Sequence, residues 1–162
     1  MNTEQKLVDA ALRAWKFNAD RLEKFFEPLS DEQLQQEVAP GRNRLVYLLG
    51  HLAAVNDRLF PLLRIGPRLH PELEPAFITS PDRSVAALPP GSELKQRLHR
   101  VDDALWTAFN KWSAAEWLER HDAVSETEFA SEPHRNRFSV MLARDTHMAF
   151  HYGQVILAKP RT

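Results

Sequence analysis

Cysteine is absent from the 162-residue sequence. Its absence excludes disulfides, thiolate ligands for a metal ion, and a cysteine nucleophile. Any sulfur chemistry would therefore depend on a sulfur atom that arrives with a substrate. Hydrophobic residues make up 43% of the chain, which is enough for one buried core, and the length suits one ordinary domain. We therefore expect residues 1–162 to form a single domain.

An excess of charge of one sign is also missing. The chain has 21 basic and 22 acidic residues, and its formal net charge is −1. Nucleic-acid-binding proteins usually present a basic surface, whereas the basic residues here are interspersed with acidic ones. We therefore expect no nucleic-acid partner.

Long hydrophobic segments are lacking as well. The longest apolar stretch, residues 45–55, is interrupted by Gly50 and His51 and is too short to cross a bilayer. Residues 1–6 lack the basic segment and apolar run of a secretory signal. We therefore expect a cytoplasmic protein that does not contact the membrane.

Four segments show the spacing of apolar residues that is typical of amphipathic helices. The predicted helices cover residues 3–26, 43–63, 92–112 and 137–159. Thr3 and Ser92 are placed to cap the first and third of these helices. The sequence therefore predicts an all-α fold, a four-helix bundle with long crossover connections.

The connecting segments differ in character. Residues 30–38 begin with a capping-box pattern and predict a short helical turn, and residues 113–116 predict another. Residues 65–91 contain more than half of the 11 prolines, which excludes a long helix there. We predict a long surface crossover for that segment and a polar loop for residues 119–133.

His147 and His151 lie four positions apart on the last predicted helix, so both side chains point the same way. This spacing alone is weak support for a site, because the chain has seven histidines. The helix face that they share is mostly apolar and should face the bundle interior. Buried imidazoles need polar partners, so the pair predicts either a site or two hydrogen-bonded core histidines.

His51 is a third histidine on an apolar helix face, in the second predicted helix and directly after Gly50. Each ring taken singly is most simply a core histidine that is satisfied by a neighbouring polar group. Three neutral imidazoles together would suit zinc or nickel, with manganese or iron as further candidates, and would leave coordination positions open. The other four histidines are expected at the surface: His70, His99, His121 and His134.

These residues resemble the signature of the DinB superfamily. The resemblance lies in Leu49-Gly50-His51-Leu52-Ala53 and, near the C-terminus, in His147-Met148-Ala149-Phe150-His151-Tyr152-Gly153-Gln154. It extends over nearly the whole chain in length, helix order and ligand positions. Phe150 departs from the commoner pattern, in which a second adjacent histidine often occurs, but the three predicted ligands are unaffected.

The resemblance implies a four-helix bundle that is often dimeric, in which three histidines bind a divalent metal ion below a substrate cleft. Characterised relatives include thiol-dependent S-transferases and mycothiol-dependent maleylpyruvate isomerases, whose metal activates the thiolate of a small cofactor. It therefore implies that His51, His147 and His151 bind the metal. A low-molecular-weight thiol and an electrophile are the implied substrates of a homodimeric transferase.

Four polar residues near the predicted ligands are candidates for substrate binding. Arg44 and Arg58 lie seven positions either side of His51, and Arg144 lies one turn before His147. Their guanidinium groups would suit the carboxylates of an anionic thiol or substrate, although arginines at bundle ends usually extend to water. Gln154 would hydrogen-bond a ligand or substrate, or else act as a polar packing residue.

The sequence leaves three functions open. The first is a metal-dependent transferase that joins a thiol to an electrophile, and the second is a non-catalytic metal-binding or stress-response interaction protein. The third is a plain bundle with three core histidines, which would bind no stoichiometric metal. A metal ion lowers the pKa of a bound thiol or water, so the first function needs no nucleophile from the protein.

Overall fold

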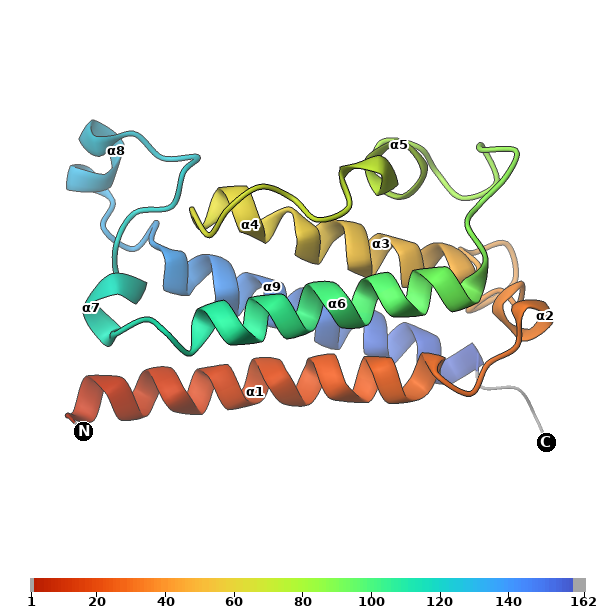
Figure 1. Ribbon diagram of the computed structural model, residues 1–162, viewed down its shortest axis with the longest axis horizontal. Helices are drawn as coiled ribbons and strands as arrows, with labels where there is room; N and C mark the ends of the chain where they lie inside the picture. The colour runs from red at the N-terminus through yellow and green to blue at the C-terminus, as the bar shows by residue number, and fades with distance from the viewer. Residues whose placement is uncertain (1, 159–162) are drawn as a thin grey trace.

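The computed structural model describes residues 2–158, and four long helices dominate it (Figure 1). They are α1 (Thr3–Phe26), α3 (Leu45–Asp57), α6 (Gly91–Phe109) and α9 (Arg137–Val155). Both α1 and α3 contact α6 and α9, so the four helices form a closed ring around a shared core. No β-strand occurs within the described residues, and the all-α prediction is confirmed.

The connection between α3 and α6 runs back along the length of the bundle. Helices α1 and α9 run in one direction and α3 and α6 in the other (Figure 1). Because α3 and α6 are parallel, the segment between them must return to the end where α3 begins. This crossover contains a 3₁₀ turn, η1 (Pro71–Leu73), and the short helix α5 (Glu74–Phe77).

The crossover was predicted to lie on the surface, and this prediction is wrong for its middle part. Leu73 and Phe77 are 1% and 0% exposed and belong to the hydrophobic core. Prolines exclude a long helix but do not prevent a single turn from placing apolar side chains inward. Consequently the crossover covers α3 as a packed layer.

The second predicted helix, residues 43–63, is divided in the structure. Helix α3 ends at Asp57, and a separate short helix, α4 (Leu59–Leu62), follows Arg58. Pro61 explains the break, because proline has no N–H to donate to the carbonyl four residues earlier and its ring clashes with that carbonyl.

Two predicted helix caps differ from those observed. Asn2, not Thr3, caps α1, and its side chain accepts a hydrogen bond from the Gln5 N–H. Helix α6 begins at Gly91 without a local side-chain cap, so the Ser92 prediction is wrong. Instead, Oδ1 of Asp31 accepts a hydrogen bond from the Gly91 N–H at 3.0 Å. A side chain from a distant connector therefore satisfies a free N–H group of α6.

Both predicted short turns are present and begin with complete capping boxes. Ser30 starts α2 (Asp31–Leu34), and Ser113 starts α7 (Ala114–Trp117). In each, the serine hydroxyl accepts from the third helical N–H, and the side chain of that third residue accepts from the serine N–H. Helix α2 ends four residues before the predicted limit at Val38.

A third capping box lies in the region predicted as a loop, residues 119–133. Ser125 and Glu128 form it at the start of α8 (Glu126–Ser131), so the loop prediction is wrong there. At the C-terminus, α9 ends at Val155 and a 3₁₀ turn, η2 (Ile156–Ala158), follows. The predicted end of that helix at residue 159 lies outside the described residues. No helix in the described part of the chain is long and apolar enough to cross a membrane.

Candidate metal centre

His51, His147 and His151 come together where α3 packs against α9. Nε2 of His147 lies 3.3 Å from Nε2 of His51 and 3.1 Å from Nε2 of His151. Potential ligand atoms of all three lie within 4.8 Å of one another. Among residues 2–158, no aspartate or glutamate joins this group. The structure therefore brings together the three histidines that the sequence singled out.

Hydrogen bonds at the far side of two rings determine which nitrogen faces the centre. Nδ1 of His51 lies 2.8 Å from the carbonyl oxygen of Phe77, and Nδ1 of His151 lies 2.8 Å from Oε1 of Gln154. Because a carbonyl oxygen only accepts, Nδ1 of His51 must carry the proton and donate it. Oε1 of Gln154 imposes the same tautomer on His151. The Nε2 atoms of both rings therefore present lone pairs to Nε2 of His147.

Converging lone pairs of this kind fit a metal cation. Two zinc–nitrogen bonds of about 2.1 Å at a tetrahedral angle would place their nitrogens about 3.4 Å apart. The observed separations of 3.1 and 3.3 Å are close to that value. Without a cation or proton between them, the lone pairs would repel one another. The donor set thus fits a borderline divalent ion, for which neutral imidazole is a suitable ligand.

Burial favours the neutral form of all three rings. Burial is the largest cause that lowers the pKa of His147, to about 3, and the neighbouring His151, Arg144 and His51 lower it further. Burial also lowers the pKa of His51 and of His151, although their hydrogen bonds oppose the change. A metal ion would therefore not have to displace a proton from these side chains near neutral pH.

Comparison with known protein families supports the same interpretation. The family model described as the DinB superfamily matches residues 14–155, a range that includes all three histidines. The chain belongs to the DinB superfamily. No curated protein matches the sequence.

In this DinB-superfamily protein, Gly50 allows the crossover to reach His51. A Cβ atom at Gly50 would overlap the ring of Phe77, which is fully buried. The close approach brings the Phe77 backbone against α3, where its carbonyl accepts from His51. The sequence contained one signal for this contact, since glycine inside a buried helix often marks a close approach. It did not identify the partner.

Gln154 contacts the centre through His151. Of the two roles predicted for it, this contact corresponds to hydrogen bonding with a ligand. Its Oε1 accepts from Nδ1 of the ligand candidate and so orients the ring. Nδ1 of His147, in contrast, is buried and has no hydrogen-bond partner among the described residues.

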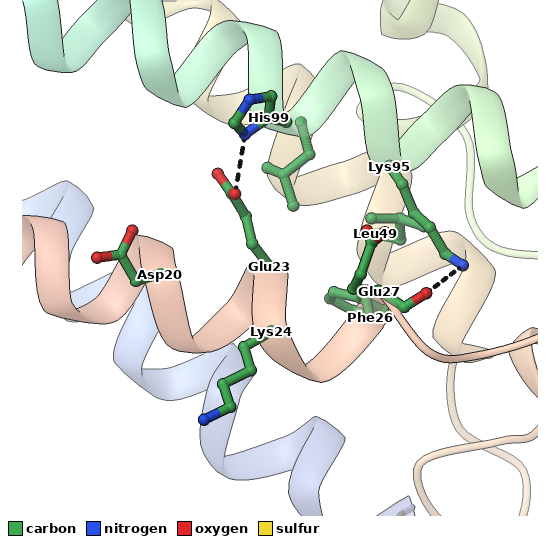
Figure 2. Close-up of a pocket in the computed structure, with 9 residues that line it drawn as sticks. Asp20, Glu23, Lys24, Phe26, Glu27, Leu49, Lys95 and His99 are labelled. Carbon is green, nitrogen blue, oxygen red and sulfur yellow. Dashed lines mark hydrogen bonds and ion pairs between the residues drawn. The ribbon is translucent and has the colours of Figure 1, made fainter.

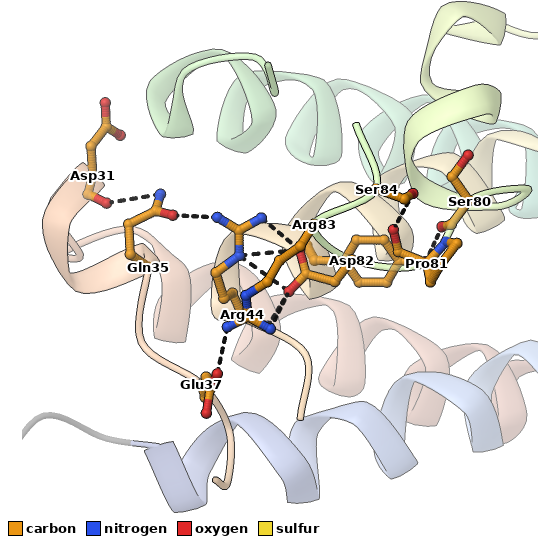
Figure 3. Close-up of polar contacts among 10 residues, drawn as sticks. Asp31, Gln35, Glu37, Arg44, Ser80, Pro81, Asp82, Arg83 and Ser84 are labelled. Atoms are coloured by element: carbon orange, nitrogen blue, oxygen red, sulfur yellow. Dashed lines mark hydrogen bonds and ion pairs between the residues drawn. The ribbon is translucent and has the colours of Figure 1, made fainter. Parts of the chain in front are cut away.

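The three candidate arginines have different surroundings. Arg44 precedes α3, and its guanidinium group binds Asp82 in the crossover and Oε1 of Gln35 (Figure 3). Arg58 follows α3 and forms two hydrogen bonds with Glu74. Both arginines therefore have partners within the protein. Arg44 also lies about 10 Å along the helix from His51, at about 1.5 Å per residue.

Arg144 is the arginine that remains beside the centre. It lowers the pKa of both His51 and His147 through its positive charge. Its own pKa is lowered to about 10, mainly by burial and then by the charge of Arg58. Its Nε atom is buried without a hydrogen-bond partner among residues 2–158.

The four histidines that were expected at the surface differ in exposure. His99 and His134 are exposed, whereas His70 and His121 are half-buried. The backbone N–H of His70 donates to buried Asp57, which draws this part of the crossover against the end of α3. None of the four approaches the centre closely enough to join its group of potential ligands.

A separate groove of about 460 Å³ lies between α1 and α6, and none of the three clustered histidines lines it (Figure 2). Nδ1 of His99 lies 3.0 Å from a carboxylate oxygen of Glu23 there. Lys95 donates to the carbonyl oxygen of Glu27 at 3.0 Å. These polar contacts stabilise the packing of α6 against the end of α1.

Proposed function

We propose that the protein is a divalent-metal-dependent transferase that joins a low-molecular-weight thiol to a small electrophile. The observation that supports this proposal is the convergence of three Nε2 atoms from His51, His147 and His151. Catalytic zinc sites commonly have three protein ligands and keep a further position for water or substrate. Zinc and nickel are the favoured ions, and manganese and iron also bind imidazole.

A bound divalent ion would lower the pKa of a thiol and make its thiolate available near neutral pH. In the overall reaction the thiol proton passes to solvent, and the sulfur forms a bond with the electrophilic carbon. When the electrophile carries a halide, the halide leaves with the electrons of the broken bond. The chain supplies no thiol of its own, because it has no cysteine.

Residues around the centre would position the ligands for this reaction. The Phe77 carbonyl and the Gln154 amide hold His51 and His151 in the tautomer that leaves Nε2 free. Such outer partners fix the orientation of metal-binding imidazoles. Gln154 is therefore better explained by this role than by direct substrate binding. Arg44 and Arg58 are held by Asp82 and Glu74, so we do not retain them as substrate ligands.

We also propose a homodimer. Large apolar side chains are exposed on the outer faces of α1 and α9, among them Leu7, Phe17, Leu142 and Phe150. Burying such side chains against a second copy would remove apolar surface from water. Light scattering coupled to size-exclusion chromatography tests this, and a mass of one chain at micromolar concentration would contradict it. One domain, a cytoplasmic location and the lack of a nucleic-acid partner remain predictions.

Metal analysis is the decisive first experiment. The protein is purified without an affinity tag, and bound metals are measured by elemental mass spectrometry. We expect about one equivalent of a divalent ion per chain from a site of this type. The variants His51→Ala, His147→Ala and His151→Ala should each lose it while circular dichroism shows that helices persist. His134→Ala, which removes an exposed histidine, is the matched control and should retain the metal.

Turnover separates the proposed function from a non-catalytic role. Metal-loaded protein is mixed with mercaptosuccinate or mercaptoethanol and with chlorodinitrobenzene, and the thioether product is measured by absorbance. Product formation that His147→Ala abolishes supports a transferase. Metal binding that raises the melting temperature without turnover for any thiol–electrophile pair would favour a non-catalytic metal-binding protein. Wild-type protein that stays metal-free after incubation with zinc, nickel and manganese would reduce the three histidines to core residues.

A further inference from the structure

Arg144 differs from the other arginines that are withdrawn from water. In the part of the chain that the structure describes, each of the others has a carboxylate partner or lies over an aromatic ring. They are Arg21, Arg44, Arg68, Arg97, Arg120, Arg135 and Arg137. Arg144 has neither kind of partner. The charged group that changes its pKa is Arg58, which has the same sign and lowers it.

The position of Arg144 makes the missing partner significant. It lies on α9 one helical turn before His147, and its positive charge acts on both His147 and His51. Its Nε–H is buried and donates to no atom within residues 2–158. A guanidinium group that is partly withdrawn from water without a counter-charge is unfavourable, and such a charge normally has an anionic partner.

The charge at the centre has the same sign throughout. Arg144 carries a positive charge, and a bound divalent ion would add two further positive charges. Nearby Arg58 is ion-paired with Glu74, whereas Arg144 has no ion-pair partner within residues 2–158 and is the guanidinium available to bind a ligand. Guanidinium groups bind carboxylates through two parallel hydrogen bonds, a geometry that a lysine cannot reproduce.

We propose that Arg144 is an anion-binding residue beside the three-histidine centre, and that its ligand is the carboxylate of a small-molecule substrate. This proposal rests on the proposed function for the substrate's second contact, which would be a thiol or other donor on the metal. The carboxylate belongs either to the thiol or to the electrophile. In both cases Arg144 selects anionic over neutral substrates.

Ligand binding to cobalt-loaded protein tests the proposal without measuring turnover. Mercaptosuccinate and neutral mercaptoethanol are titrated separately, and the cobalt absorption bands are recorded. We expect wild-type protein to bind mercaptosuccinate at least about tenfold more tightly, because a charge-assisted bidentate contact is worth that much or more. Arg144→Gln should reduce the preference to within about threefold, and Arg144→Lys should restore part of it.

Arg21→Gln is the matched control. Arg21 is also half-buried and also has a buried Nε without a hydrogen-bond partner in the described structure, but it lies 4.0 Å from the ring centre of Tyr152. This variant should keep the wild-type preference for mercaptosuccinate. Equal affinity of the wild type for both thiols, or a preference that survives in Arg144→Gln, would overturn the proposal.

A thermal-stability measurement distinguishes this role from a structural one. Arg144→Gln should keep or raise the melting temperature of ligand-free protein, because it removes an unpaired charge from a half-buried position. A marked decrease would indicate that Arg144 supports packing, and would count against the proposal.

Succinate, a dicarboxylate without a thiol, identifies which substrate carries the carboxylate. If succinate binds together with mercaptoethanol, the carboxylate belongs to the electrophile, and if the two exclude each other, it belongs to the thiol. If the protein binds no metal, the proposed function fails, but succinate can still be tested on metal-free protein. A rise in melting temperature that Arg144→Gln abolishes would support the anion site on its own, and no rise would overturn it.

Discussion

Replacing Asp102 with asparagine should stabilise the protein, and the gain should increase with pH. Asp102 lies on α6 in the bundle interior, 4% exposed, and accepts a hydrogen bond from Nδ2 of Asn56 at 2.7 Å. Burial raises the pKa of this carboxyl group from 3.8 to about 8, the Asn56 hydrogen bond opposes the rise, and the charge of Glu23 adds to it. The carboxyl group is therefore mostly protonated in the folded protein at neutral pH.

The sign of the effect follows from proton binding. In the unfolded chain Asp102 loses its proton near pH 3.8, whereas in the folded protein it keeps the proton until about pH 8. Folding therefore requires proton uptake across this range, and the contribution of Asp102 to stability decreases as the pH rises. This contribution to the free energy of unfolding falls by about 1.4 kcal/mol per pH unit, which amounts to about 3 kcal/mol between about pH 5 and about pH 7.

Asparagine has nearly the shape of a protonated aspartic acid, and its side-chain oxygen can accept the same hydrogen bond from Asn56. Asp102→Asn should therefore remove the pH-dependent loss and leave the packing intact. Urea denaturation of both proteins at several values between about pH 5 and about pH 8 gives the difference in free energy of unfolding. That difference should rise steadily with pH in favour of the variant.

Asp103→Asn is the control, since it removes a carboxylate at the neighbouring, exposed position of the same helix. It should change the free energy of unfolding by less than about 0.5 kcal/mol. A difference between Asp102→Asn and wild type that is constant across the pH range would refute the reasoning. So would destabilisation that is greatest at high pH.

Three further predictions concern the surroundings of the centre. Gly50→Ala should lower the free energy of unfolding by about 1–3 kcal/mol, because the new Cβ overlaps the buried Phe77 ring; unchanged urea denaturation would show that the ring can move. Gln154→Ala should weaken metal binding about 10- to 100-fold, because His151 loses the acceptor that orients its ring. Competition with a chelator measures the metal affinity, and equal affinities of variant and wild type would contradict this prediction. Arg44→Ala should speed proteolysis within the crossover at unchanged metal stoichiometry, and equal proteolysis rates would show that its ion pair adds nothing to docking.

Most of the long helices could be predicted from the sequence, because their apolar residues recur every three to four positions and so lie on one face of a helix. The prediction was least accurate at helix ends, because single residues decide where a helix begins or stops. Pro61 breaks the second helix, and it lay inside an apolar run that still read as helical. Ser125 begins α8 through a pattern that the sequence did contain, the serine followed three residues later by glutamate.

The candidate site also has parts that the sequence could predict and parts that it could not. His147 and His151 are near each other along one helix, so their spacing showed that they point together. The placement of His51 opposite them rested on its apolar surroundings and on the family resemblance. The carbonyl of Phe77 could not be predicted, because every residue has a backbone carbonyl and only the tertiary fold selects one. The partners of Arg44 and Arg58 were missed for a similar reason, since both come from the crossover.

One acceptor at the centre belongs to the crossover, not to the bundle helices. The Phe77 carbonyl orients His51, and Asp57 and Arg44 attach the crossover to the two ends of α3. Docking of the crossover and binding of a metal are therefore thermodynamically coupled. Whatever free energy the docked crossover adds to metal affinity, the bound metal adds equally to docking. Metal affinity in this protein can thus be altered from a segment that supplies no metal ligand.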